Sequence, residues 1–340
     1  MSIFNYFGQL KLTDDQESAL NSLESFLKSD VPIFMLKGYA GTGKTTLIQG
    51  IAQYLQEEEK RPAHFMAPTG RAAMVINQKA RLGASTIHKR IYNFNELLET
   101  KDGSSFKFYY GTKTNEGLIN KANEAPVNVV YLIDEASMLS DKYTEDEFFR
   151  FGSGYLLKDL FKFAFEGNNR RKIIFIGDNA QLPPVGMKFS PALSEAYIAD
   201  TYRLNSESVT LKKVIRQQKE SGILGTATGI REKIAQHTFN EFQIDYSKQD
   251  VFKTNPENFI SSYVKHAKEN GVDNTSVITH SNEQALNYNQ LIRGKRYGKE
   301  DLPLQKKDLL IITKNNYNYA VEVFNGMFAE VIEVGGISYQ

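Results

Sequence analysis

A glycine-rich segment, GYAGTGKT at residues 38–45, constrains the fold of this chain more than any other feature. The apolar run VPIFML precedes it, and a helical pattern follows at residues 46–55. Together they satisfy G-x-x-x-x-G-K-[ST] in its required context, between a strand and a helix. The segment predicts a phosphate-binding loop, and a glycine loop of purely structural purpose has about one chance in twenty.

The residue types of this loop suit a nucleotide and Mg²⁺. Glycines let main-chain N–H groups close around phosphates, and the N-terminus of the following helix presents its positive end to them. Lys44 is expected to reach the β- and γ-phosphates and Thr45 to ligate Mg²⁺. We therefore predict ATP and Mg²⁺ as cofactors. The cofactor-binding residues predicted in the loop are Gly38, Ala40, Gly41, Thr42, Gly43, Lys44, Thr45 and Thr46.

An acidic pair follows a second apolar run, in VVYLIDEAS. Asp134 and Glu135 would lie at the carboxyl end of a strand, where ligands bind in open α/β sheets. Asp134 suits the Mg²⁺ shell, and Glu135 suits polarisation of an attacking water. Taken alone, a plain helix-start role for the pair has even odds, and the phosphate loop lowers those odds well below even.

A third apolar run, IIFIGDNAQLPPV, ends in polar residues and two prolines. The amide of Gln181 could hydrogen-bond a γ-phosphate or the water beside it and lose that contact after hydrolysis. The alternative is a turn with a solvent-facing glutamine, at about one chance in three without the other motifs.

Short apolar runs alternate with helical stretches, which predicts a doubly wound α/β sheet. Thr13 and Gln16 form a capping-box pattern that begins a helix. A helical region is expected from near Ser206, followed by strands at SVIT (276–279) and DLLIIT (308–313). At 340 residues we expect two domains, 1–200 and 201–340.

Residues 92–125 interrupt the alternation, and we expect a β-hairpin inserted into the first domain. The aromatic run FKFYY would form its first strand, residues 111–117 its turn, and a short return strand would follow.

Composition and sequence pattern give no sign of a strongly basic nucleic-acid binder, a cysteine or histidine metal site, a secreted protein or a membrane protein. Lysine and arginine total 41 against 40 acidic residues, so the net charge of +1 gives no electrostatic footprint for nucleic acid. The chain has no cysteine, and its five histidines have no metal-ligand spacing. It has neither a signal-peptide pattern nor an apolar run long enough to span a bilayer. We expect a soluble, cytoplasmic protein without a membrane partner.

Six segments resemble, in order, motifs I, Ia, Ib, II, III and IV of superfamily 1 helicases of the RecD/Dda-like branch. They are GYAGTGKT, MAPTGRAA, ASTIHK, LIDEASM, GDNAQLPPV and LKKVIRQ. The resemblance extends from about Leu12 to the C-terminus. It implies tandem RecA-like P-loop NTPase domains that hydrolyse MgATP, translocate 5′ to 3′ on single-stranded DNA and unwind duplex. The implied partners are single-stranded DNA and fork duplex, for a monomeric motor that works with replication or recombination proteins.

The resemblance also implies roles for single residues. Gln16 resembles the adenine-contacting glutamine, which is compatible with its capping role, and Arg216 resembles an arginine finger, although a lone helical arginine is more often a surface residue. The implied single-strand contacts are Pro68, Thr69, Arg71, Ser85, Thr86 and His88. In the second domain, Ser281, Asn282, Asn289 and Arg293 stand at matching positions, and Asn325 and Gly326 resemble the entry to a β-barrel insertion.

For strand separation, we expect the hairpin at residues 104–120 to be the wedge that meets the duplex. Its candidates are the aromatic residues Phe106, Phe108, Tyr109 and Tyr110. An exposed ring could stack on the last base pair, worth roughly 1–3 kcal/mol per base. Because strand side chains alternate, one face of the hairpin is expected to pack on the first domain instead.

The chain departs from the family pattern at its end, because motifs V and VI do not occur before Gln340. We therefore expect a second domain that is incomplete, a longer parent protein, and weak or no motor activity from these residues by themselves. Two alternatives stay open, a RecD-like subunit of a multi-subunit exonuclease and a P-loop nucleotide switch that does not translocate. A purely structural role leaves Lys44, Asp134, Glu135 and Gln181 unexplained.

Overall fold

The computed structural model describes residues 1–8, 10–80, 83–102, 105–113, 128–145, 149–213, 221–238, 241–299, 303–313, 323 and 325–335. The chain divides into two compact units, Met1–Gln217 and Gln218–Gln340, which are described separately below.

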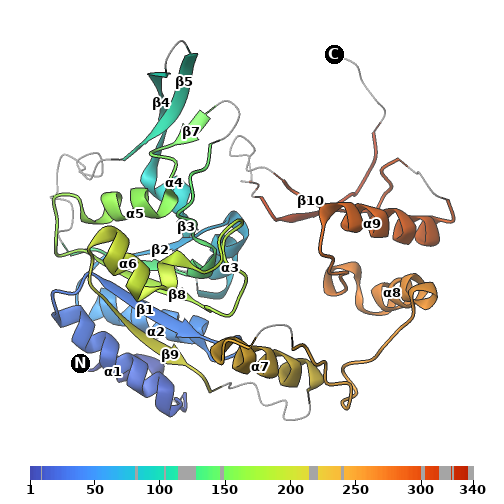
Figure 1. The fold of residues 1–340 in the computed structure, drawn as a ribbon, viewed down its shortest axis with the longest axis horizontal. Coiled ribbons are helices and arrows are strands. Elements are labelled where there is room, and N and C mark those ends of the chain that lie inside the picture. Colours follow the sequence, from blue (N-terminus) through green and yellow to red (C-terminus); the bar gives the residue numbers. More distant parts are fainter. Residues whose placement is uncertain are drawn as a thin grey trace. The chain divides into compact units, whose positions relative to one another are not determined.

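Unit 1 is built on a parallel sheet (Figure 1). Its strand order is β3-β2-β6-β8-β1-β9. The strands are β1 (Ile33–Gly38), β2 (Ala63–Ala67), β3 (Ser85–Thr86), β6 (Val130–Ile133), β8 (Lys172–Gly177) and β9 (Ser206–Leu211). Every pairing in this sheet is parallel, which confirms the predicted α/β class with a parallel central sheet.

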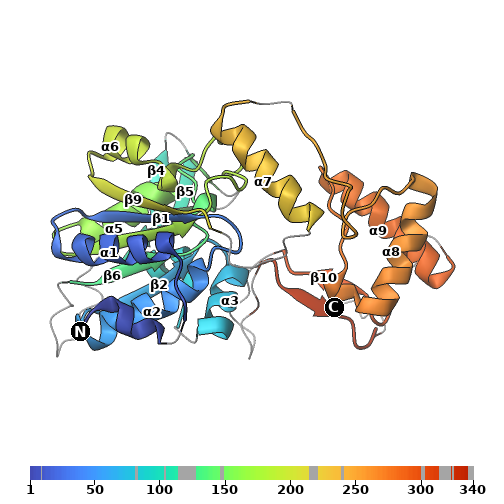
Figure 2. The ribbon, with the colours of Figure 1, turned by 90° about the horizontal axis from the view of Figure 1, so that it is seen from below.

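Helices cover both faces of this sheet (Figure 1, Figure 2). The short 3-10 helix η1 (Ile3–Phe7) and the helices α1 (Asp14–Lys28), α2 (Lys44–Glu57) and α3 (Gly70–Ala80) pack on one face. The helices α4 (Ile87–Ile91), α5 (Leu156–Phe165) and α6 (Glu195–Tyr202) pack on the other. Parallel strands buried on both faces are expected to be almost continuously apolar, as the central strands β1, β6 and β8 are.

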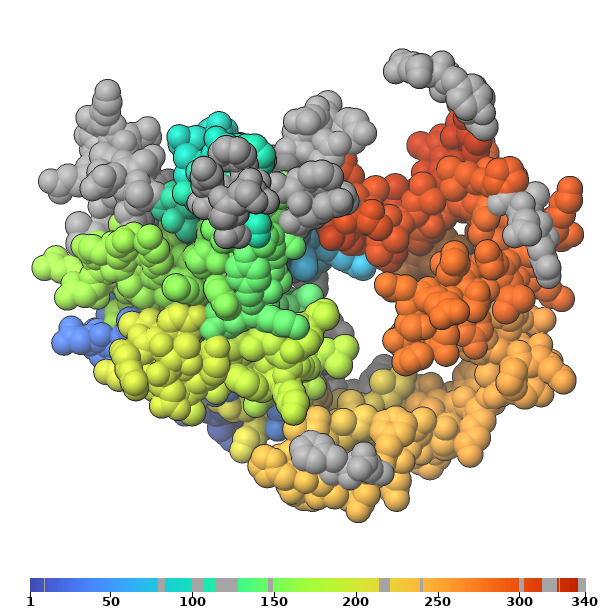
Figure 3. Space-filling model, turned by 45° about the horizontal axis from the view of Figure 1, so that its top comes forward, coloured from blue at the N-terminus to red at the C-terminus, as the bar shows by residue number. Residues whose placement is uncertain are grey.

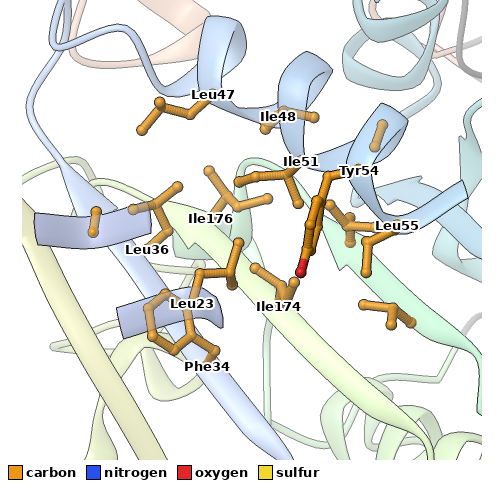
Figure 4. Close-up of a cluster of buried hydrophobic side chains, with 14 of the residues drawn as sticks. Leu23, Phe34, Leu36, Leu47, Ile48, Ile51, Tyr54, Leu55, Ile174 and Ile176 are labelled. Atoms are coloured by element: carbon orange, nitrogen blue, oxygen red, sulfur yellow. The ribbon is translucent and has the colours of Figure 1, made fainter. Parts of the chain in front are cut away.

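The core on the first face is shown in Figure 4. Leu23 of α1 and Ile51 of α2 pack toward Phe34 and Ile174 of the sheet, all at 2% exposure or less. Burying one such side chain contributes roughly 1.5–3 kcal/mol before entropy is counted. This packing fixes α2, and with it the loop that precedes it, on the sheet.

The inserted sheet contains β4 (Tyr92–Asp102), β5 (Ser105–Thr112) and β7 (Phe149–Phe151). Figure 3 shows its cyan atoms projecting beyond the green atoms of the neighbouring part of unit 1. A hairpin is present, but its expected turn at 111–117 is wrong. Asp102 pairs with Ser105, so the aromatic run forms the second strand. The Asp-Gly dipeptide at 102–103 is a strong hairpin-turn signal, and it predicts the turn between β4 and β5 better than residues 111–117 do. Residues 114–127 lie outside the described residues.

The helix expected from Ser206 is also wrong, because β9 pairs in parallel with β1 along its whole length. Leu211 is buried and Val209 packs against the α1–α2 core, while Thr210 between them and Ser208 before them are polar. This period of two is that of a strand with one buried face. The strand places the division between the units at Gln217, later than the expected residue 200.

Unit 2 contains α7 (Gly222–Ala235), α8 (Pro256–Asn270), the 3-10 turn η5 (Val272–Asn274), α9 (Asn282–Tyr297), β10 (Leu309–Ile311) and β11 (Phe328–Glu330). The expected strand within 308–313 is present as β10, paired antiparallel with β11. The strand expected at 276–279 does not form, and Ile278 is 95% exposed. A parallel strand needs a neighbouring strand, and among the described residues of unit 2 the paired strands are β10 and β11.

Asp308 fixes α9 to β10. Its carboxylate accepts hydrogen bonds from Arg293 (2.9 Å), the Tyr297 hydroxyl (3.0 Å) and the Gln305 amide (2.9 Å). Burial by itself raises the pKa of Asp308, but these hydrogen bonds outweigh it, so the pKa lies below its ordinary value. Arg293, expected at a motif position, therefore has a structural contact within unit 2.

Within the part of the chain that the structure describes, no helix combines the length and apolarity needed to cross a bilayer.

Candidate active site

Three adjacent strands of unit 1 deliver the predicted site residues to one edge of the sheet. The glycine loop follows β1, the acidic pair follows β6, and Asp178 follows β8, which lies between them. Because the strands are parallel, their carboxyl ends meet at the same edge. The sheet topology therefore brings together three segments that lie far apart in the sequence.

The glycine loop enters α2 directly. Gly41 and Gly43 have φ angles of 81° and 82°, values that favour glycine. Gly43 is the N-cap of α2 and provides no side-chain cap for the first helical N–H groups. Such N–H groups, together with the helix dipole, form an anion-binding site.

Lys44 lies across the loop that precedes it. Its Nζ donates hydrogen bonds to the carbonyl oxygens of Gly38 (2.6 Å) and Tyr39 (3.0 Å). A Cβ added to Gly38 would meet the Thr42 hydroxyl at 2.9 Å and Leu211 Cβ at 3.0 Å, so this position has no room for a side chain. The main chain of the loop thus closes around the positively charged amine of Lys44.

Gln16 connects α1 to this loop. Its side-chain oxygen accepts from the Thr13 amide at 3.0 Å, and the Thr13 hydroxyl accepts from the Gln16 amide, which confirms the predicted capping box. Its side-chain nitrogen donates to the carbonyl of Thr42 at 2.9 Å, and Gln16 is 3% exposed. The predicted contact with adenine stays a prediction.

In the acidic pair, Glu135 has a left-handed backbone conformation and a raised pKa. Asp134 Oδ1 accepts from the Glu135 amide at 2.9 Å, and Glu135 has φ of 53°, a left-handed conformation that costs a non-glycine residue roughly 1–3 kcal/mol. Burial raises the pKa of Glu135, and the charges of Asp134 and Asp178 raise it further against the opposing effect of Lys44. These four charged groups therefore act on one another electrostatically.

The segment after β8 is tied to the acidic segment. Asp178 is fully buried, and its carboxylate accepts from the Ala180 amide at 3.0 Å. The exposed Gln181 accepts a hydrogen bond of 3.5 Å from the buried hydroxyl of Ser137, which follows the acidic pair. Sequence reasoning missed Ser137, because only the fold brings it to Gln181.

The predicted DNA contacts lie where β2 and β3 end, on neighbouring strands. The Thr69 hydroxyl accepts from the Ala72 amide and the Thr86 hydroxyl from the Lys89 amide, so both begin helices. The His88 ring packs against Tyr92 and Phe151, and burial lowers its pKa to about 4. Contacts of these residues, and of Pro68, Arg71 and Ser85, with DNA stay predictions.

The wedge candidates divide between two faces of the inserted sheet. Tyr110 packs against Phe149 and Phe151, with ring centroids 5.4 and 5.6 Å apart. Tyr109 lies on the opposite face, with the guanidinium of Arg150 at 5.7 Å from its ring centroid. Phe108 is 41% exposed. The side chain of Phe106 and the whole of Arg216 lie outside the described residues.

Sequence reasoning also missed a connection between the acidic segment and α6. Asp141 accepts hydrogen bonds of 2.6 Å from the hydroxyls of both Tyr197 and Tyr202. Burial and the Asp141 carboxylate raise the pKa of Tyr197 to about 12. No spacing in the sequence indicates this contact.

The site suits Mg²⁺ shared with a nucleotide. Among the described residues, no group of three or more His, Cys, Asp or Glu is arranged to hold a metal ion. Mg²⁺ commonly takes one or two protein oxygens and completes its shell with phosphate oxygens and water. The Thr45 hydroxyl and the Asp134 carboxylate are oxygen donors of this kind. Burial chiefly, and then the charges of Asp134 and Asp178, raises the pKa of Glu135, and a cation held beside these carboxylates would offset their mutual repulsion.

A parallel sheet with a glycine loop between β1 and α2, and an acidic pair after β6, defines a P-loop NTPase of the RecA-like class. This fold implies nucleotide binding and hydrolysis. The family described as AAA domain matches residues 11–243. The match covers more than half of the chain, so the chain belongs to this family of P-loop NTPases.

Known proteins similar to this chain are longer. Uncharacterized protein R530 of Acanthamoeba polyphaga mimivirus is 29% identical over 310 residues, covering 82% of this chain and 55% of that protein. The RecD subunit of the RecBCD enzyme of Buchnera aphidicola is 27% identical over 222 residues, covering 59% of this chain and 33% of that subunit. The crystal structure of Pif1 helicase from Candida albicans aligns with 96% of this chain and 69% of its own, at 18% identity and a TM-score of 0.43.

Proposed function

We propose that this chain is the ATP-hydrolysing motor of a DNA helicase that moves 5′ to 3′ on single-stranded DNA and unwinds duplex. The observation that carries the proposal is the meeting of the glycine loop, the acidic pair and Gln181 at the carboxyl edge of one parallel sheet. Unit 1 would be the first motor domain, and unit 2 would belong to the second.

Lys44 and the loop bind the phosphates in this proposal. The Lys44 amine exchanges its main-chain acceptors, the carbonyls of Gly38 and Tyr39, for phosphate oxygens. Thr45 and Asp134 would hold Mg²⁺, which supplies charge neutralisation to the phosphates when it is bound. Gln16, already held against Thr42, would place its remaining amide hydrogen toward the base of the nucleotide.

Glu135 orients and polarises the attacking water. A raised pKa makes a carboxylate a stronger base, and here burial and two neighbouring carboxylates raise it. Gln181 would sense the γ-phosphate, and its contact with Ser137 gives it an alternative partner once phosphate has left. Arg216 would contribute a further positive charge in the transition state.

Single-stranded DNA would cross unit 1 along the ends of β2 and β3. The residues proposed for it are Pro68, Thr69, Arg71, Ser85, Thr86 and His88. Main-chain amides and small hydroxyls at these ends suit phosphates, which accounts for DNA binding by a chain with a net charge of +1. On the inserted sheet, Phe108 is the exposed candidate ring, whereas Tyr109 is half-buried beside the Arg150 guanidinium and Tyr110 packs against Phe151.

Two substitutions test the chemistry. Lys44→Ala should abolish ATP hydrolysis and weaken nucleotide binding, whereas Glu135→Gln should bind MgATP and turn over at least about a hundredfold more slowly, because it keeps the shape of the side chain and loses the base. Nucleotide binding and single-turnover hydrolysis are measured side by side. The matched controls are Lys158→Ala and Glu57→Gln, both exposed and remote from the loop. Unchanged turnover in Glu135→Gln would remove the assigned base.

A second candidate is a RecD-like subunit, which the similarity to the Buchnera protein favours. The two candidates share the nucleotide site but differ in dependence on partners. A subunit would gain DNA-stimulated ATPase activity only after partner chains are added, whereas a stand-alone motor would show it without them.

A further inference from the structure

One buried carboxylate joins the two ends of the inserted sheet. Asp159 lies in the first turn of α5 and is 2% exposed. Its Oδ2 accepts a hydrogen bond from the Tyr92 hydroxyl at 2.8 Å and another from the Ser153 amide at 2.9 Å. The nucleotide chemistry described above uses none of these groups.

These two donors stand where the chain enters and leaves the insertion. Tyr92 is the first residue of β4 and follows the last residue of α4 without a linker. Ser153 comes two residues after the end of β7. The same carboxylate oxygen therefore holds the entry and the exit of the three-stranded sheet to α5.

The backbone leaves space for this carboxylate through a glycine. Gly152 has φ of 48°, and an added Cβ would lie 2.1 Å from Asp159 Oδ2 and 2.8 Å from the Tyr92 ring. The Gly152 amide in turn donates to the Tyr110 carbonyl of β5 at 2.9 Å. No other residue fits here without displacing the hydrogen-bonded pair.

Aromatic packing extends the connection to the hairpin and to α4. The Phe151 ring lies 5.3 Å from Tyr92, 5.6 Å from Tyr110 and 5.1 Å from His88, centroid to centroid. His88 belongs to the helix that follows β3, at the edge proposed for DNA. The contacts thus run without interruption from that edge of the sheet to the strand that carries Phe108 and Tyr109.

We propose that Tyr92 and Asp159 are positioning residues that hold the β4–β5 hairpin at a fixed angle on unit 1, so that its exposed rings split the duplex as the strand advances. A fully satisfied, buried hydrogen-bond network rigidifies the elements it joins. A wedge must transmit force to the duplex, which a hinged hairpin cannot do. This inference rests on the proposed helicase function.

The test compares Tyr92→Phe, which keeps the ring and removes the hydroxyl, with Asp159→Asn. The matched control is Tyr197→Phe, which removes a similar tyrosine–carboxylate hydrogen bond from the same side of the sheet. Hydrogen exchange of β4 and β5 amides is measured against those of β1, β6 and β8. Both variants should exchange about tenfold faster in the hairpin alone, as expected for the loss of one hydrogen bond, and the control should not.

Activity gives the second readout. In the full-length parent protein, Tyr92→Phe should unwind forked duplex several-fold less per ATP hydrolysed than the wild type. Its ATPase rate with single-stranded DNA should stay within about twofold of the wild type, since the nucleotide site is untouched. Unchanged hairpin exchange in both variants would overturn the inference, as would an equal loss of ATPase and unwinding. A wild-type protein without DNA-stimulated ATPase would instead overturn the proposed function, and hairpin exchange would still test the anchor.

Discussion

Lys44 illustrates how single residues prepare the nucleotide site. Its amine is held by two carbonyls of the loop that it serves, so the side chain already lies in the loop where these acceptors would be exchanged for phosphate oxygens. Ordering a long side chain costs roughly 0.5–1.5 kcal/mol on binding, and a lysine placed in advance avoids much of that cost. The close packing around Gly38 also helps to fix the conformation of the loop.

Gly38→Ala should disturb this order. The new methyl group would press on the Thr42 hydroxyl and on Leu211, and overpacking of this kind costs about 1–3 kcal/mol. Because Thr42 lies in the loop, we expect nucleotide affinity to fall about tenfold or more while the fold is retained. Titration with a fluorescent ADP analogue measures this. Gly229→Ala, at an open position, is the control, and an equal affinity of Gly38→Ala and wild type would show that the loop adapts.

Lys172 makes a prediction about pH. It is 5% exposed, donates to the carbonyls of Ser29 and Val31, and lies over the Phe26 ring. Burial chiefly, helped by Arg61, lowers its pKa to about 8. Between that value and its ordinary 10.5 the unfolded chain binds more protons than the folded one, so the free energy of unfolding should rise with pH.

The measurement is chemical denaturation between pH 8 and about 10, where Lys172 adds a slope of at most about 1.4 kcal/mol per pH unit. Above pH 10 tyrosines act in the opposite direction, since their raised pKa values let the unfolded chain lose protons first. Lys172→Met should remove the added slope. An identical slope in both proteins would mean that folding does not lower the pKa of Lys172.

Among the elements, the inserted sheet is the one whose removal should separate two activities. Replacing residues 97–110 by a short glycine-serine turn removes the exposed Phe108 and the half-buried Tyr109 and spares the hydrogen bond between Tyr92 and Asp159. We expect fork unwinding to fall at least about fivefold, the equivalent of one lost stacking contact of 1–3 kcal/mol, with DNA-stimulated ATPase retained. The two rates are measured on one preparation. Parallel loss of both would show that the sheet is structural.

The sequence predicted elements best where the pattern was local and the element long. The P-loop, its flanking strand and helix, and the α1 capping box form from neighbouring residues, and all are present. The strand β9 was mistaken for a helix, because its short alternating pattern becomes decisive only beside β1. The segment at 276–279 has strand-forming residues, but the described part of unit 2 offers it no partner.

The site could be predicted only as far as its motifs. Asp134, Glu135 and Gln181 each follow an apolar run, so their edge of the sheet could be inferred, but their contacts could not. The Ser137 contact with Gln181 and the Asp159 contact with Tyr92 join residues 44 and 67 positions apart. Such contacts depend on strand order, which one sequence does not specify.

At the scale of the whole molecule, the two units differ in how much apolar surface they bury. Unit 1 has a core on each face of its sheet. In the described residues of unit 2, Val331 is the buried hydrophobic side chain, and α8 and α9 bury none. Hydrophobic burial is the main source of stability, so unit 1 should keep its fold and its nucleotide site under conditions that loosen unit 2.

The central claim is that this nucleotide site belongs to a DNA-driven motor, and the direct measurement is steady-state ATP hydrolysis by the full-length parent protein with and without single-stranded DNA. Hydrolysis by the wild type should rise when the DNA is added, and should stay at background in Lys44→Ala and Glu135→Gln under both conditions. Thr86→Ala and Arg71→Ala should raise the DNA concentration needed to stimulate hydrolysis, and should leave nucleotide affinity unchanged. Hydrolysis by the wild type that is the same with and without DNA would contradict the account and leave a nucleotide switch that does not translocate.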